Sequence, residues 1–156
     1  MTMLETDRLI LRDLQESDLP ALIALNQDPE VMQYFPKPYS QAESLRLYQG
    51  IQDEVKAYGY SLWAVEEKSS QEFIGLVGLH HSDLWITTEA AQACLDFAFQ
   101  QAGLSEVHSF TSLLNQPSQK VMQKLGMEFV KEFDNEKVPA DSPLYRHVLY
   151  RIKSFH

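Results

Sequence analysis

The second half of the chain alternates between helical and strand patterns, and this alternation limits the possible folds more than any other feature. Apolar residues recur at helical spacing over residues 87–102, and a strand pattern follows over 107–113. A second helix is predicted to begin at Asn115, and a strand follows over 127–131. Helices that connect successive strands imply right-handed crossovers and some parallel pairing. We therefore expect an α/β or α+β fold class with a central mixed sheet.

Two helices are predicted in the first half of the chain. The first has a candidate N-cap at Ser17 and ends at Asp28, which precedes a proline. The second begins at Ser40, which fits a capping box with Glu43, and ends at Gly59, a suitable C-cap. Its inward face is expected to carry four apolar residues at helical spacing: Leu45, Tyr48, Ile51 and Val55.

Strand patterns account for most of the remaining sequence. Residues 60–66 and 73–80 are predicted to form a hairpin, because a short polar segment joins them. The second of these strands is almost wholly apolar, which is typical of a central strand covered on both faces. Gly75 and Gly78 in this strand indicate a bulge or a close approach of another backbone. Two further strands are expected at the ends of the chain, over 8–14 and 144–152.

Length and charge restrict the classes of partner. The 156 residues suit a single domain over 1–156. A net charge of −9 repels phosphate backbones, so we expect no nucleic-acid partner, whereas cationic amines would be weakly attracted. The sequence contains no apolar run of membrane-spanning length and no recognisable secretory signal. The single cysteine, Cys94, excludes an internal disulfide. We therefore expect a cytoplasmic protein with no membrane partner.

Self-sufficient catalytic motifs are absent from the sequence, which has no phosphate-binding Gly-Lys-Ser loop, no nucleophile elbow and no set of paired cysteines. His80 and His81 are adjacent on a predicted strand, so their side chains point to opposite faces and chelate one metal ion poorly. We expect no metal site. Cys94 lies in the apolar stripe of a predicted helix, where a thiol is usually inert, and this disfavours an acyl-cysteine mechanism.

Five segments carry a resemblance to a known family. They are LETDRLILR at 4–12, FIGLVGL at 73–79, TTEAA at 87–91, NQPS at 115–118 and KLGM at 124–127. Each segment is weak evidence alone, but their order resembles the GNAT-family N-acetyltransferases, specifically the branch of the ribosomal-protein alanine acetyltransferases. The resemblance covers nearly the whole chain. It implies a mostly antiparallel, twisted sheet flanked by about four helices, and transfer of an acetyl group from acetyl-coenzyme A (acetyl-CoA) directly to an amine.

The resemblance also implies residues that hold the cosubstrate. Backbone amides at the helix start of Thr88, Glu89 and Ala90 would bind the pyrophosphate, because a helix N-terminus attracts anions. Asn115 would contact the pantetheine arm, and Ser118 would lie near the thioester sulfur and protonate the departing thiolate. A simpler interpretation also stays open, since both residues occupy positions where helix caps belong and capping alone would explain them.

The catalytic acid and base are less well defined than the cosubstrate contacts. Many relatives carry a tyrosine one turn after the position of Ser118, whereas this chain has Met122, which cannot donate a proton. Glu132 and Glu136 follow the next strand and could reach the substrate side, and we take Glu136 as the candidate base. Both glutamates could equally be surface charges, with water relaying the proton.

One stretch departs from the family pattern. Relatives carry a strand and a glycine-rich loop, on the order of 20 residues, directly before the helix that matches Thr87 onward. This chain reads HHSDLWIT over residues 80–87 instead. Either the segment is deleted and the protein is a non-catalytic relative, or the protein carries a further segment there that this sequence omits. We favour the second interpretation, because losing the strand would leave buried backbone groups without partners.

If a segment is omitted, at least one junction between Asp83 and Ile86 is not a peptide bond in the protein. The best candidates are Asp83–Leu84 and Trp85–Ile86, and Cα atoms more than about 3.8 Å apart would identify the false junction. The expected activity is acetyl-CoA-dependent acetylation of a primary amine, either on a protein N-terminus or on a small molecule. The alternative is a non-catalytic binding or regulatory domain on the same scaffold. A homodimer is compatible with both.

Overall fold

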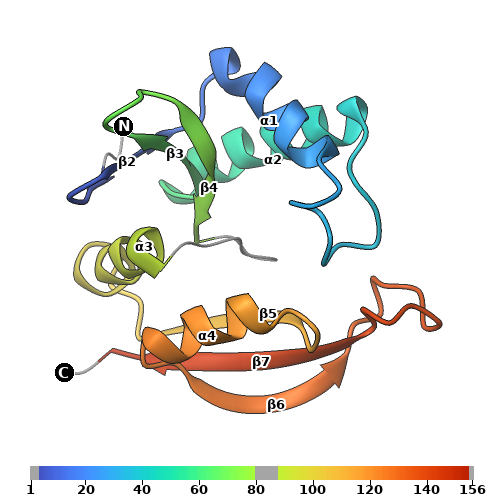
Figure 1. Cartoon of the computed structure of the whole chain (residues 1–156). Helices are drawn as coiled ribbons and strands as arrows, with labels where there is room; N and C mark the ends of the chain where they lie inside the picture. The colour runs from blue at the N-terminus through green and yellow to red at the C-terminus, as the bar shows by residue number, and fades with distance from the viewer. Residues whose placement is uncertain (1–3, 80–87, 155–156) are drawn as a thin grey trace.

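The computed structural model describes residues 4–79 and 88–154, which fold into two sheets with helices packed around them (Figure 1). The first part holds β1 (Leu4–Glu5), β2 (Leu9–Asp13), the 3-10 turn η1 (Glu16–Asp18), α1 (Leu19–Gln27), α2 (Gln41–Tyr58), β3 (Leu62–Glu67) and β4 (Phe73–Gly78). The second part holds α3 (Thr88–Gln100), β5 (Glu106–Ser112), α4 (Gln116–Lys124), β6 (Glu128–Asp134) and β7 (Arg146–Lys153). The predicted α+β class is confirmed.

The two sheets have the strand orders β1-β2-β3-β4 and β5-β7-β6, and every strand pair in the described part of the chain is antiparallel. The predicted parallel pairing is not seen there. The crossover that motivated it does exist, because α4 connects β5 to β6 and these two strands run in the same direction. However, β7 lies between them and is antiparallel to both. The last strand of the chain, β7, therefore lies between β5 and β6 and separates the two strands that would have paired in parallel.

Three apolar clusters hold the elements together. The predicted apolar stripe of α3 packs on one face of the first sheet, where Cys94 and Ala98 lie in one buried cluster with Leu11, Trp63 and Val77. Helices α1 and α2 cover the opposite face through a second cluster. Helix α4 packs on the second sheet through a third cluster, formed by Met122, Met127, Val148 and Tyr150. The first sheet is therefore covered on both faces.

Strand β4 is an edge strand and not the predicted central one. It ends the order of the first sheet among the described strands, and the side chain of Ile74 is 44% exposed. The two glycine predictions are confirmed. The register between β3 and β4 shifts beside Gly75, which marks a bulge. Gly78 lies so close to the backbone of Ser61 that a Cβ atom there would overlap the Ser61 carbonyl oxygen.

The predicted ends of α2 are confirmed, but one residue of its predicted inward face is not. Ser40 and Glu43 form the reciprocal capping box, and Gly59 ends the helix in the left-handed conformation with φ of 81°. Leu45 is 42% exposed, because the buried face of α2 is centred on Ser44 and Ile51. Helix α1 starts two residues after the predicted cap: Asp18 is its N-cap, and the 3-10 turn precedes it.

Candidate functional site

A cavity of about 340 Å³ opens beside the start of α4, and we call it the α4 cavity. It lies where the segment between α1 and α2 faces β5, β7 and the connection between β6 and β7. Its volume is at the lower end of the range for small-molecule pockets. Its lining consists of Tyr34, Phe35, Pro36, Lys37, Tyr39, Phe110, Thr111, Ser112, Asn115, Asn135, Lys137, Val138 and His147.

Asn115 combines a structural role with a position in the cavity lining. Its Oδ1 accepts a hydrogen bond from the backbone N–H of Ser118 at 3.2 Å, which is the N-cap interaction of α4. Its Nδ2 donates to Oγ1 of Thr111 at 3.0 Å. An amide nitrogen has two hydrogens, and among the described residues the second one has no recorded acceptor. The predicted cap is confirmed, and one N–H donor is left for a ligand.

The two residues predicted to be catalytic do not line the α4 cavity. Ser118 is half-buried in the first turn of α4, and Glu136 is exposed. Glu136 lies between two residues that do line the cavity, Asn135 and Lys137, although the glutamate itself is outside the lining. The catalytic roles of Ser118 and Glu136 stay predictions.

His147 was missed by the sequence analysis, and it is the buried ionisable group of the cavity lining, with 8% of its surface exposed. Its Nδ1 lies 3.3 Å from the carbonyl oxygen of Tyr145, and its Nε2 lies 3.3 Å from Nδ2 of Asn135. A carbonyl only accepts hydrogen bonds and an amide nitrogen only donates them. The neighbours therefore favour a ring that carries a proton on Nδ1 and donates it to Tyr145, while the lone pair of Nε2 accepts the N–H of Asn135.

A second depression, the α3 groove, has a volume of about 840 Å³ and runs along the start of α3. It contains two of the three residues predicted to bind the pyrophosphate, Thr88 and Glu89, whereas Ala90 is buried in the core beneath. The α3 groove and the α4 cavity share no lining residue. The complete groove lining is Glu5, Thr6, Asp7, Arg8, Thr88, Glu89, Gln92, Ala93, Asp96, Lys124 and Leu125.

The carboxylate of Glu89 is held by the N-terminal segment and not by its own helix. It accepts hydrogen bonds from Oγ1 of Thr6 at 2.6 Å and from Nε and Nη2 of Arg8 at 2.9 and 2.6 Å. The hydrogen bonds from Thr6 and Arg8 lower the pKa of Glu89. Because this carboxylate is turned towards Thr6 and Arg8, it does not itself cap the first-turn N–H groups of α3.

Cys94 has the properties of inert packing. Burial raises the pKa of its thiol to about 12, so the nucleophilic thiolate is scarcely populated at neutral pH. Across residues 4–79 and 88–154, no group of three or more His, Cys, Asp or Glu side chains is placed to hold a metal ion. No helix within these residues is long and apolar enough to span a membrane. His80, His81 and the junctions between Asp83 and Ile86 lie outside the described residues.

Known proteins resemble this chain in sequence and in fold. The Bacillus subtilis (strain 168) protein YkkB is 29% identical over 150 residues, which cover 83% of this chain and 87% of YkkB. An acetyltransferase of the GNAT family from Bacillus anthracis has the same fold, with a TM-score of 0.80, 19% identity and coverage of 97% of this chain and 98% of its own. The ribosomal L7/L12 acetyltransferase RimL, solved with coenzyme A, gives a TM-score of 0.77 at 16% identity, covering 97% of this chain and 98% of RimL.

The alignment with YkkB has 150 positions, but it covers only 83% of this chain, or about 130 residues. About twenty positions of the relative therefore have no counterpart here, which agrees with the shortened stretch before α3. The model of the GNAT acetyltransferase domain matches residues 8–87 and 85–128, and its two segments meet at that same stretch. Together these segments span most of the chain, which belongs to the GNAT acetyltransferase family of transferases.

Proposed function

We propose that the protein transfers the acetyl group of acetyl-CoA directly to a primary amine that binds in the α4 cavity. The observation that carries this proposal is the convergence of Asn115 and His147 on one cavity at the start of α4. Asn115 offers a free N–H donor, and an N–H of the amine would replace that of Asn135 as the hydrogen-bond donor to Nε2 of His147. These are complementary functions for holding a polarised carbonyl and an attacking amine side by side.

Acetyl-CoA would supply the activated thioester. The backbone N–H groups of Thr88, Glu89 and Ala90 in the first turn of α3, together with Asn115, are the groups that we propose hold it. The orientation of Glu89 supports this assignment, because its carboxylate is turned towards Thr6 and Arg8 and does not compete for those N–H groups. The aromatic and apolar lining of the α4 cavity would exclude water from the reacting groups.

The acceptor is proposed as a protein N-terminus or a small-molecule amine. Structural likeness to RimL supports placing the chain near the ribosomal-protein acetyltransferase branch, although 16% identity establishes the fold alone. The competing hypothesis is a binding or regulatory domain without catalysis, and the shortened stretch at residues 80–87 is its specific support. A homodimer and a cytoplasmic location complete the proposal.

Two measurements on the purified full chain test the proposed function. Isothermal titration with acetyl-CoA should show binding, and a thiol-release assay with an amine panel should show turnover. Binding without turnover on any amine would favour the regulatory hypothesis, and no binding would reject the enzyme. The intact mass of the natural protein decides separately whether a segment is missing from this sequence, since an omitted segment raises the mass above 18.0 kDa.

The role of Ser118 has its own prediction. If its hydroxyl protonates the departing thiolate, Ser118→Ala should lower kcat by about 100-fold, which is the usual range for losing a general acid. The cap of α4 should survive, because Asn115 binds the backbone N–H of residue 118 and not its side chain. Ser69→Ala, in the exposed turn between β3 and β4, is the matched control. An unchanged kcat would remove Ser118 from the acid role.

A further inference from the structure

We propose that the acceptor in the α4 cavity is a small aminocarboxylate, whose carboxylate pairs with Lys137. This inference rests on the proposed function and adds the substrate class. It starts from a contrast in charge. The whole chain carries 22 acidic against 13 basic residues, yet the thirteen residues that line the α4 cavity include two lysines and no aspartate or glutamate. An acidic protein thus presents a locally cationic cavity, which favours a ligand with a negative group.

The two lysines are not equivalent. Nζ of Lys37 donates to Oε1 of Glu43 at 2.8 Å, so its charge is largely offset. Lys37 and the capping contacts of Ser40 lower the pKa of Glu43 to about 2, and this glutamate therefore remains ionised at all working pH values. Lys37 consequently contributes little net positive charge to the cavity.

Lys137 has no ion-pair partner among the residues that the structure describes. Its backbone is fixed, because its N–H donates to Oδ1 of Asn135 at 3.1 Å, while its side chain is exposed and lines the cavity. Asn135 in turn contacts Nε2 of His147. Asn135 therefore connects the backbone of Lys137 to His147, the proposed amine-binding residue. An acceptor with an amine at one end and a carboxylate at the other can contact His147 and Lys137 together.

The rest of the lining suits the carbon skeleton of such an acceptor. Four aromatic rings contribute to it, and those of Phe35 and Tyr39 meet edge to face with centroids 6.0 Å apart. Rings of this kind bind flat apolar groups and lower the local dielectric, which strengthens an ion pair. Cationic surroundings also lower the pKa of a bound ammonium, so more of the acceptor is a neutral nucleophile. The cavity volume of about 340 Å³ fits a small molecule better than the N-terminus of a folded protein.

A pair of matched amines tests the proposal: 4-(aminomethyl)benzoate and 4-(aminomethyl)benzamide, which differ in charge and hardly in shape. With saturating acetyl-CoA, the wild-type protein should show a KM about fivefold lower for the benzoate, as expected for one ion pair with a partly exposed lysine. Lys137→Met should remove that preference by raising the KM of the benzoate about fivefold, to the value for the benzamide. Lys131→Met, an exposed lysine of β6 outside the cavity, should keep it.

Direct titration of both amines into the protein separates this inference from the proposed function. Tighter binding of the benzoate that Lys137→Met abolishes would support the charge-selective cavity even if no acetyl transfer is detected. Equal binding of the two amines, or a preference that survives Lys137→Met, would overturn it. An acidic peptide with a free N-terminus completes the series, and a lower KM for the peptide than for the benzoate would reject the small-molecule acceptor.

Discussion

The α3 groove and the α4 cavity are both lined by polar residues, but the charged side chains of the two linings differ in sign and in pairing. In the groove, acidic and basic side chains occur together, and the guanidinium of Arg8 donates two hydrogen bonds to Glu89. In the cavity, the lining includes two lysines and no carboxylate, and the other polar groups lie beside aromatic rings. Paired charges fix elements to each other, whereas an unpaired cation beside neutral donors is suited to hold a ligand. The two depressions are therefore suited to different tasks.

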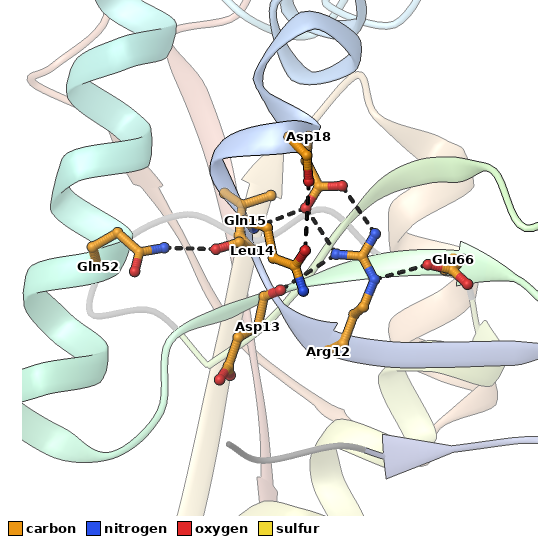
Figure 2. A network of polar contacts seen from close by, with 8 residues as sticks. Arg12, Asp13, Leu14, Gln15, Asp18, Gln52 and Glu66 are labelled. Carbon is orange, nitrogen blue, oxygen red and sulfur yellow. Dashed lines mark hydrogen bonds and ion pairs between the residues drawn. The ribbon is translucent and has the colours of Figure 1, made fainter.

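The strongest example of charges used for structure lies in the first sheet (Figure 2). The guanidinium of Arg12 on β2 donates to both carboxylate oxygens of Asp18, at 2.8 and 2.9 Å, and to Glu66 on β3 at 2.8 Å. Burial alone would raise the pKa of Asp18, but the hydrogen bonds from Arg12 and from the backbone of Gln15 lower it. One arginine thus connects two strands to the N-cap of α1.

The largest predicted effect follows from this network. Arg12→Met should reduce the free energy of unfolding by about 2–3 kcal/mol, at the lower end for breaking a buried ion pair because the Arg12 side chain is 18% exposed. Urea denaturation measures the loss. Lys137→Met, in the cavity, should leave the unfolding midpoint unchanged. Equal losses in the two variants would contradict the contrast between paired and unpaired charges.

The pH dependence of the same variant has a definite sign. Asp18 has a lowered pKa in the folded protein, so its contribution is present above the unfolded pKa of about 3.9 and is lost as the pH falls through the folded value. In Arg12→Met, Asp18 has lost the arginine that lowers its pKa, so most of this contribution to stability is already absent. The difference in stability between wild type and variant should therefore be largest at neutral pH and shrink as the pH falls below about 4. A difference that grows in acid would contradict the assignment.

A second, smaller effect separates the two roles of Asn115. Asn115→Ala should cost about 1 kcal/mol of stability, because the N–H of Ser118 loses its cap. Asn115→Asp keeps an oxygen for that cap, and the Thr111 hydroxyl can donate to its second oxygen, but the variant loses both amide N–H donors. If the free N–H contacts acetyl-CoA, the aspartate variant should melt like the wild type and bind acetyl-CoA more weakly by titration. Unchanged affinity in Asn115→Asp would leave capping as the only role.

Local sequence signals predicted those features of the fold that depend on neighbours in sequence. The capping box at Ser40, the C-cap at Gly59 and the N-cap at Asn115 are all confirmed, because each is satisfied within one helical turn. The apolar stripe of α3 is confirmed for the same reason. Strand order was not predictable in this way. That β7 separates β5 from β6 is decided by long-range pairing, which no spacing within one segment reveals.

The candidate site shows the same limit. Resemblance led to Asn115 and the start of α3, since those positions belong to recognisable segments. His147 carries no such signal, because a single histidine in a strand pattern usually fills space. Its proposed role follows from β7, which brings it beside Asn135, twelve positions away, and from its place in the lining of the α4 cavity. Lys137 likewise has no local sequence signal, and its proposed role follows only from its position in the lining of the α4 cavity.

The smallest predicted effect concerns the Arg8–Glu89 pair of the α3 groove. The Arg8 side chain is 78% exposed, so water competes for its charge and the pair contributes little to global stability. Glu89→Gln keeps one acceptor for Thr6, and we expect a urea midpoint indistinguishable from that of the wild type. The loss should instead be local, because the contact joins residues 6–8 to the start of α3. Amide hydrogen exchange over residues 4–13 should accelerate, while exchange in α2 stays constant. A global shift of the midpoint, comparable with that of Arg12→Met, would show that this exposed pair supports the fold as the buried network does, and the contrast between the two regions would fail.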